Sequence, residues 1–126
     1  MNENVLDSSA VLAVLNQEKG AEKALQYFPD AIISSINLAE VLTKSIERGH
    51  DITTAIKTFN LLQIKVVDFD FEQAVKAAEL RSLTKHLGLS LGDRSCLALA
   101  ILRNTIAVTA DKEWAKLSLC QIEVIR

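Results

Sequence analysis

Short apolar runs alternate with longer segments of helical periodicity along the chain, and this alternation is the strongest constraint on its fold. Between the short runs, apolar residues recur at i, i+3 and i+4, as in the segment 74–83. Alternating strands and helices are typical of a mostly parallel sheet covered by helices on both faces. The sequence therefore predicts an α/β protein whose strands are 5–6, 31–33, 64–67, 106–109 and 122–125.

Length and composition limit the chain to one domain. It has 126 residues, 49% of them hydrophobic, and a chain of this length buries roughly 70% of the surface that its unfolded form exposes. One Pro and four Gly provide no flexible linker. A disordered chain, a collagen-like repeat and a two-domain enzyme are excluded. We expect a single domain spanning residues 1–126.

The sequence contains no pattern typical of secretion or membrane insertion. The first residues lack the basic start and the apolar run of a signal peptide. No window reaches the ~18 uninterrupted apolar residues of a membrane span. The two cysteines, Cys96 and Cys120, fit no metal pair or disulfide framework. We expect a soluble, cytoplasmic protein in a reducing compartment, with no membrane partner.

The charge balance excludes some classes of nucleic-acid binder. Fourteen basic and 16 acidic residues give a net charge of 14 − 16 = −2, which argues against a broad basic surface. Only 5% of residues are aromatic, which argues against a base-stacking platform. The positions of the acids matter more than their number. If four of the acids lie together in one metal pocket, the other residues carry a net charge of 14 − 12 = +2.

Asp7 and Asp111 each follow a predicted strand at its carboxyl end. Ligands of parallel α/β sheets bind in the crevice outside that edge. A helical stretch also begins after each acid, so both positions are equally typical of helix starts. At the first of them, Ser8 or Ser9 is expected to cap the helix. Both interpretations stay open for each acid.

Glu40 lies on a helix predicted over 36–42, which Ser35 is expected to cap. At about 100° per residue, Glu40 sits beside Ile36 on the rim of the apolar stripe rather than opposite it. The alternative is a surface ion pair with Lys44 at i+4, which is worth only about 0.3–0.5 kcal/mol. Its position favours a role at the edge of the core.

Asp93 lies in a helix, 91–103, that is apolar nearly all round and is therefore expected to be buried. The residues three, four and seven positions later are all apolar. An unpaired charge on that face costs several kcal/mol, so it needs a cation or a changed protonation state. The alternative is a capping box, because Ser90 precedes Asp93 by three residues. The two roles are compatible.

Four carboxylates at one sheet edge repel one another unless a cation lies between them. Clusters of oxygen ligands suit Mg²⁺ or Mn²⁺. Such ions activate water and stabilise the charge of a phosphoryl group under attack. His50 and His86 are isolated and expected to be exposed, so they provide no zinc site. The sequence also has no Gly-rich phosphate loop and no Ser-His-Asp constellation.

Four short motifs resemble those of PIN domains, in particular the compact ribonuclease toxins of the VapC type. Each motif is weakly specific alone, but the four occur in the right order over nearly the whole chain. They are Val5-Leu6-Asp7-Ser8-Ser9-Ala10, Asn37-Leu38-Ala39-Glu40-Val41, Leu89-Ser90-Leu91-Gly92-Asp93-Arg94 with Leu97-Ala98, and Thr109-Ala110-Asp111. The resemblance assigns metal binding to Asp7, Glu40, Asp93 and Asp111, a supporting hydroxyl to Thr109, and polar neighbours to Ser8 and Asn37.

The resemblance implies a three-layer α/β/α sandwich that cleaves RNA with the help of Mg²⁺ or Mn²⁺. It also implies a homodimer and, for a toxin, inhibition by a cognate antitoxin. Such antitoxins insert a peptide, often carrying Arg, near the acidic pocket. The four acids do not distinguish a toxin from a PIN nuclease that serves RNA processing.

Five basic residues are candidates for contacts with the RNA backbone. Each lies near one of the four acids, either on the same helix or directly after it. The alternative is that they are solvated or form surface ion pairs of little energy. The candidates are Lys44, Arg48, Arg94, Lys112 and Lys116.

Two rivals belong to other functional classes. A phosphoacceptor receiver has similar length and alternation, and Asp68 or Asp70 after the third strand is its candidate acceptor. It requires an adjacent acid pair after the first strand, where Ser8 follows Asp7, and a Lys closing the last strand. We expect the acids at 68 and 70 to cap the next helix instead. The second rival is a non-catalytic interaction module that gains no stability from metal.

Two further expectations concern the region 50–62. Asp51 or Thr53 is expected to cap a helix that follows the break at Gly49. The apolar residues of that helix are expected to lie in the core, with a groove for a partner helix as the alternative. They are Ile52, Ile56, Phe59 and Leu62.

Overall fold

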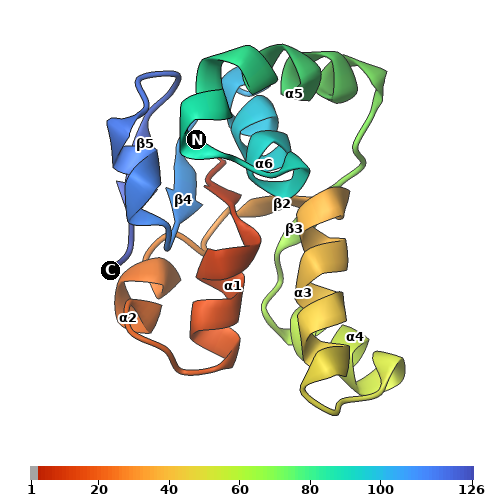
Figure 1. Ribbon diagram of the computed structural model, residues 1–126. Helices are drawn as coiled ribbons and strands as arrows, with labels where there is room; N and C mark the ends of the chain where they lie inside the picture. The colour runs from red at the N-terminus through yellow and green to blue at the C-terminus, as the bar shows by residue number, and fades with distance from the viewer. Residues whose placement is uncertain (1–2) are drawn as a thin grey trace.

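A computed structural model describes residues 3–126 and contains one five-stranded sheet (Figure 1). Every strand pairing is parallel, and the order is β3-β2-β1-β4-β5. The strands are β1 (Val5–Leu6), β2 (Ile32–Ser34), β3 (Lys65–Val67), β4 (Ala107–Thr109) and β5 (Ile122–Val124). The predicted α/β class and its parallel sheet are confirmed.

The helices connect these strands in the predicted alternation. They are α1 (Ser8–Leu15), α2 (Ala21–Leu25), α3 (Ser35–Glu47), α4 (Ile52–Leu61), α5 (Phe71–Thr84) and α6 (Leu91–Leu102). Two short 3₁₀ helices, η1 (Lys85–Leu87) and η2 (Lys112–Lys116), complete the structure. Two helices, α3 and α4, lie between β2 and β3, as the sequence predicted.

The sheet separates two apolar cores, because successive residues of a strand point to opposite faces. Val5 packs with α5, α6 and Trp114 on one face. Leu6, its neighbour, packs with α1, α2, α3 and α4 on the other. Figure 1 shows α5 and α6 on one side of the sheet and α1 to α4 on the other. These helices and the sheet form the expected three-layer α/β/α sandwich.

The central position of β1 decides where the acids meet. Val5 pairs with Ile32 of β2 and with Ala107 of β4. The carboxyl ends of these three parallel strands therefore lie side by side at one edge of the sheet. β3 lies outside β2, so the residues that follow β3 are at the margin of that edge.

The strand order excludes the receiver alternative. Receivers have the doubly wound order 2-1-3-4-5, in which the third strand is next to the first. Here β3 pairs with β2 and not with β1. Asp70 caps α5 by accepting a hydrogen bond from the amide of Gln73 at 2.9 Å, as predicted. Asp68 does not cap this helix, because the N-cap position belongs to Asp70.

Helix α6 is buried almost all round, as its composition predicted. Six consecutive residues, 95–100, are buried. The helix contacts α5 and α3 as well as β1, β2 and β4. This position carries Asp93, in the first turn, to the carboxyl edge of the sheet.

One predicted helix cap is wrong, at α3, and another is confirmed, at α4. Ser34, not Ser35, caps α3 and accepts from the amide of Ile36 at 3.2 Å. The hydroxyl of Ser35 accepts instead from the amide of Phe69 at 3.0 Å and so joins α3 to the segment after β3. Of the two candidates for α4, Asp51 is the cap and accepts from the amide of Thr54 at 2.8 Å.

The prediction that the apolar residues of α4 lie in the core is only half correct. Ala55 and Phe59 are buried and form the face of α4 that packs against the domain. Ile52 and Ile56 are exposed, since they lie on a different face of the helix. Leu62 is partly buried. Within residues 3–126, no helix combines the length and apolar character required to cross a membrane.

Candidate active site

The carboxyl edge of the sheet gathers the four acids that the sequence singled out. Asp7 follows β1 directly, and Asp111 comes two residues after β4. Glu40 lies in the second turn of α3, which begins where β2 ends, and Asp93 is in the first turn of α6. The charges of Glu40 and Asp93 act on Asp7, and those of Glu40 and Asp111 act on Asp93. The four carboxylates are therefore close enough to influence one another's ionisation.

Asp7 is the most deeply buried of the four, with 3% of its surface exposed. Burial raises its pKa from 3.8 to about 7; the Ser9 hydroxyl opposes this shift, and the charge of Asp93 adds to it. Its Oδ1 is buried without a hydrogen-bond partner among the described residues. The side chain does not cap α1. An acid this buried, with an unsatisfied oxygen, is typical of a ligand site.

Two hydroxyls hold the other oxygen of Asp7. Ser9 donates to Oδ2 at 2.6 Å and Thr109 donates to the same atom at 3.0 Å. The two hydroxyl oxygens are 3.2 Å apart. Thr109 also accepts from the amide of Asp111 at 3.1 Å, and Ser9 accepts from the amide of Ala110 at 2.9 Å. This network joins the segment after β1 to the segment after β4 and fixes one side of Asp7.

Ser9 is the residue that the sequence analysis failed to assign. Ser8 was expected to be the polar neighbour of Asp7, and either serine was expected to cap α1. The hydroxyl in the site belongs to Ser9, and no side chain caps α1. The sequence alone does not distinguish two adjacent serines at a helix start, because the first turn of the helix decides which one faces the sheet.

Glu40 is held by Asn37 from the preceding turn of α3. Asn37 is fully buried, and its Nδ2 donates to Glu40 Oε1 at 2.9 Å and to the carbonyl of Gly92 at 3.0 Å. The ion pair considered for Glu40 does not form, since Lys44 lies 3.5 Å from Glu47 instead. Glu40 therefore faces α6 and does not pair with Lys44 at the surface.

Asp93 forms the predicted capping box. Its carboxylate accepts from the amide of Ser90 at 3.0 Å, and the Ser90 hydroxyl accepts from the amide of Asp93 at 3.1 Å. Burial raises the pKa of Asp93, the bonds from Ser90 oppose this, and the charges of Glu40 and Asp111 add to it. Asp93 thus caps α6 and also faces the other acids.

Asp111 caps η2, as the capping alternative predicted. Its Oδ1 accepts from the amide of Glu113 at 2.9 Å. The side chain is only partly buried, and its negative charge contributes to the raised pKa of Asp93. Asp111, like Asp93, therefore both caps a helix and lies near the other acids.

The donor chemistry of this edge suits a hard divalent cation. Carboxylate oxygens dominate, and two buried oxygens, Asp7 Oδ1 and Asn37 Oδ1, have no hydrogen-bond partner among residues 3–126. In the same part of the chain, no three His, Cys, Asp or Glu side chains form a group that would hold a metal ion as they stand. The residues nevertheless fit Mg²⁺ or Mn²⁺ in the type of their ligand atoms.

The basic candidates fall into three positions. Lys44 and Arg48 border a cleft of about 270 Å³ that Ser9 and Arg126 also line, beside the hydroxyl network of Asp7. Lys112 and Lys116 are exposed on η2, where Lys116 pairs with Glu113 at 2.6 Å. The Arg94 side chain is directed to α5, because its Nη1 donates to the carbonyl of Ala77 at 2.9 Å.

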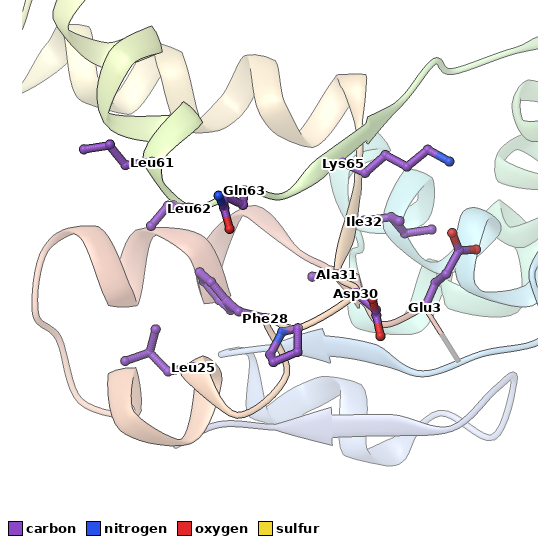
Figure 2. A pocket seen from close by; sticks show the side chains of 11 residues that line it. Glu3, Leu25, Phe28, Asp30, Ala31, Ile32, Leu61, Leu62, Gln63 and Lys65 are labelled. Atoms are coloured by element: carbon purple, nitrogen blue, oxygen red, sulfur yellow. The ribbon is translucent and has the colours of Figure 1, made fainter. Parts of the chain in front are cut away.

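A cavity of about 870 Å³ lies at the opposite edge of the sheet (Figure 2). Ala31 and Ile32, at the amino end of β2, and Lys65, at the amino end of β3, line it. Figure 2 shows Phe28 and Leu61 among the side chains around it. None of the four acids contributes to this cavity. The acidic edge, where the four acids gather, is therefore the better candidate site.

The histidines are exposed, and neither cysteine has the lowered pKa of a reactive thiol. His50 and His86 are exposed, as expected. Cys96 is buried and Cys120 partly buried, and both are free thiols. Burial raises the pKa of both thiols, that of Cys120 to about 11, so the reactive thiolate forms are disfavoured.

Solved structures share this fold at low sequence identity. A toxin–antitoxin complex from Klebsiella pneumoniae has a chain that superimposes with a TM-score of 0.79 and 20% identity, covering 98% of both chains. The DNA-bound VapBC structure from Salmonella typhimurium gives 0.76 and 19%, covering 100% of both. VapBC-5 from Mycobacterium tuberculosis gives 0.67 and 24%, covering 100% of this chain and 99% of the other.

Sequence comparison gives the family directly. No curated protein is similar enough in sequence to be matched to this chain. The family model of the PIN domain matches residues 5–118, which include all four acids and the hydroxyls of Ser9 and Thr109. The chain belongs to the PIN domain family.

Proposed function

We propose that the protein is a ribonuclease that depends on Mg²⁺ or Mn²⁺ and cleaves phosphodiester bonds of RNA. The observation that carries the proposal is Asp7, which is buried, has one unpartnered oxygen and lies within the electrostatic influence of Glu40 and Asp93. Membership of the PIN family supports a nuclease. A buried acid surrounded by like charges destabilises the fold, and a bound cation offsets that cost.

Each of the four acids has a proposed role. Asp7 and Asp93 bind the ion directly. Glu40 binds through water or orients the attacking water, and Asp111 binds the ion or holds a water beside it. When bound, one or two such ions activate water and stabilise the charge on the phosphoryl group.

The surrounding residues orient the acids. Ser9 and Thr109 hold Asp7 Oδ2, so that Oδ1 is left for a ligand. The capping box fixes the Asp93 carboxylate on the first turn of α6. These bonds organise the site before substrate arrives, which lowers the cost of bringing the reacting groups together.

Cations beside the acids are proposed to bind the RNA backbone. Lys44 and Arg48 line the cleft that begins at Ser9, one residue removed from the α1 start. Lys112 and Lys116 lie on η2, directly after Asp111. The two groups come from different elements, α3 with its C-cap residue and η2. A strand of RNA that places a phosphate at Asp7 has adjacent phosphates within reach of one group or the other.

We further propose that the protein is the toxin of a toxin–antitoxin pair and forms a homodimer. The similar solved structures are described as toxin–antitoxin complexes or VapBC structures. A cognate antitoxin inhibits the proposed ribonuclease by inserting a peptide near the acidic pocket. The alternative, a PIN nuclease that serves RNA processing, requires no such partner. A small adjacent gene whose product copurifies with this chain and blocks its cleavage supports the toxin, and absence of inhibition contradicts it.

Cleavage of structured RNA tests the nuclease proposal. Wild-type protein is incubated with labelled RNA and Mg²⁺ or Mn²⁺, with EDTA as the control, beside the Asp7→Asn variant. Metal-dependent fragments from the wild type alone are expected. A thermal melt with and without each ion tests the non-catalytic alternative, which predicts the same melting temperature under both conditions.

A further inference from the structure

Gly92 occupies a position where helix geometry does not require glycine. It is buried in the first turn of α6 and is not one of the glycines with positive φ. Glycine disfavours a helix relative to alanine. The reason for glycine here must therefore lie in what packs against it.

The neighbour of Gly92 is the carboxylate of Glu40. A Cβ built on Gly92 would lie 2.6 Å from Cδ and 2.7 Å from Oε1 of that side chain. Non-bonded carbon and oxygen atoms do not approach this closely, so the carboxylate occupies the space that a side chain at position 92 would fill. Glu40 comes from α3, so the contact joins two helices beside the acidic edge.

Asn37 forms hydrogen bonds with both partners of this contact. It is fully buried and donates from the same Nδ2 to Glu40 Oε1 at 2.9 Å and to the carbonyl of Gly92 at 3.0 Å. One amide nitrogen therefore binds both the glycine backbone and the carboxylate packed upon it. The Asn37 bond holds the flexible end of Glu40 against α6, and a side chain at position 92 would displace that end.

We propose that Gly92 and Asn37 are positioning residues that set the Glu40 carboxylate beside Asp93 for binding of the divalent cation. The inference rests on the proposed function, and it assigns Gly92 a role that acts through Glu40 alone. Asp93 is the next residue in the chain, so the backbone that accepts the Asn37 bond also carries the second acid. The contacts of Asn37 and Gly92 with Glu40 thus fix the separation of Glu40, on α3, from Asp93, on α6.

A double-mutant cycle tests this coupling. Gly92→Ala is made in the wild type and in the Glu40→Ala variant, and Mn²⁺ affinity and the melting temperature without metal are measured for all four proteins. In the wild type, Gly92→Ala is expected to weaken Mn²⁺ binding about ten-fold, a typical cost for residues that orient metal ligands. In the Glu40→Ala background it is expected to leave Mn²⁺ affinity unchanged, because the carboxylate it displaces is absent.

Two further variants keep the result unambiguous. Asn37→Ala is expected to weaken Mn²⁺ binding in the same background-dependent way. Leu91→Ala, at an exposed position in the same helical turn, is the matched control and is expected to change nothing. Equal effects of Gly92→Ala in both backgrounds, or none in either, overturn the proposal and indicate helix packing only.

The outcomes for the proposed function are separate. A wild-type protein that neither binds Mn²⁺ nor cleaves RNA contradicts the function and with it this inference. A wild-type protein that does both, with a Gly92→Ala variant of equal Mn²⁺ affinity, contradicts only the inference.

Discussion

The hydroxyl of Thr109 lies 3.0 Å from Oδ2 of Asp7 and 3.1 Å from the amide nitrogen of Asp111. It donates to the first and accepts from the second, so one side chain links two of the four acids. Thr109 is fully buried at the end of β4, next to β1 in the sheet.

Replacing Thr109 by valine tests this link. Valine keeps the shape and removes both bonds, which leaves the Asp111 amide unpaired at a cost of about 1–3 kcal/mol. We expect metal-dependent cleavage to fall about ten-fold, by analogy with residues that orient metal ligands. Thr109→Ser keeps the hydroxyl and is expected to retain most activity. Cleavage rates under single-turnover conditions compare the three proteins, and equal rates for valine and serine contradict the role.

Replacing Asp7 by asparagine is expected to separate stability from activity. The change removes a charge that is buried and surrounded by other acids, while keeping the size of the side chain. Cleavage is expected to be lost. The melting temperature at pH 7.5 without metal is expected to rise by at least about 4 °C, since one pKa unit corresponds to about 1.4 kcal/mol. A lower melting temperature than wild type contradicts the burial argument.

The stability of the metal-free protein is expected to depend on pH through Asp7. The folded state raises the pKa of Asp7 from 3.8 to about 7 and therefore binds its proton more tightly than the unfolded state. The stabilising contribution of the protonated form is complete below about pH 4 and is lost as the pH rises to about 7. Denaturant titrations across this range measure it, and the Asp7→Asn variant is expected to lose this component. Saturating Mg²⁺ is expected to reduce the loss, because the cation favours the ionised form.

Replacing Lys44 and Arg48 together by alanine is expected to weaken RNA binding and flatten its salt dependence. Each neutralised phosphate contributes roughly −0.7 to the slope of log K against log salt for single strands. Both the parent and the double variant also carry Asp7→Asn, so that the RNA is not cleaved. Their RNA-binding constants are measured at several salt concentrations and give the slope. Lys57→Ala with Lys85→Ala, two exposed lysines on α4 and η1, is the control. An unchanged slope indicates that residues other than Lys44 and Arg48 bind the RNA backbone.

Arg94 is expected to act on stability. Its guanidinium donates to the carbonyl of Ala77 and joins α6 to α5, and its Nε is buried without a partner among the described residues. Arg94→Ala is expected to lower the free energy of unfolding by about 1–3 kcal/mol. The salt slope of RNA binding is expected to stay at its wild-type value. A flatter slope with unchanged stability contradicts this interpretation and returns Arg94 to the RNA-binding set.

The sequence predicted the parallel sheet and the positions of the four acids, since both follow from the period of apolar residues and from the rule that parallel strands share an edge. It did not distinguish Ser8 from Ser9, or Ser34 from Ser35, because a shift of one residue at a helix start turns a hydroxyl from the sheet to another segment. Contacts between segments that are far apart in the sequence could not be predicted either. The packing of Glu40 on Gly92 depends on how α3 crosses α6, which no local pattern encodes.

The strand order has a consequence for synthesis of the chain. β1 is made about a hundred residues before one of its two neighbours, β4, which is residues 107–109. Until that segment leaves the ribosome, Asp7 has no Thr109 hydroxyl beside it, and the acidic edge is open on one side. A nascent or prematurely ended chain therefore carries three of the four acids without a complete site. A cell that makes this protein meets the assembled acidic site only after residues 107–111 have been synthesised.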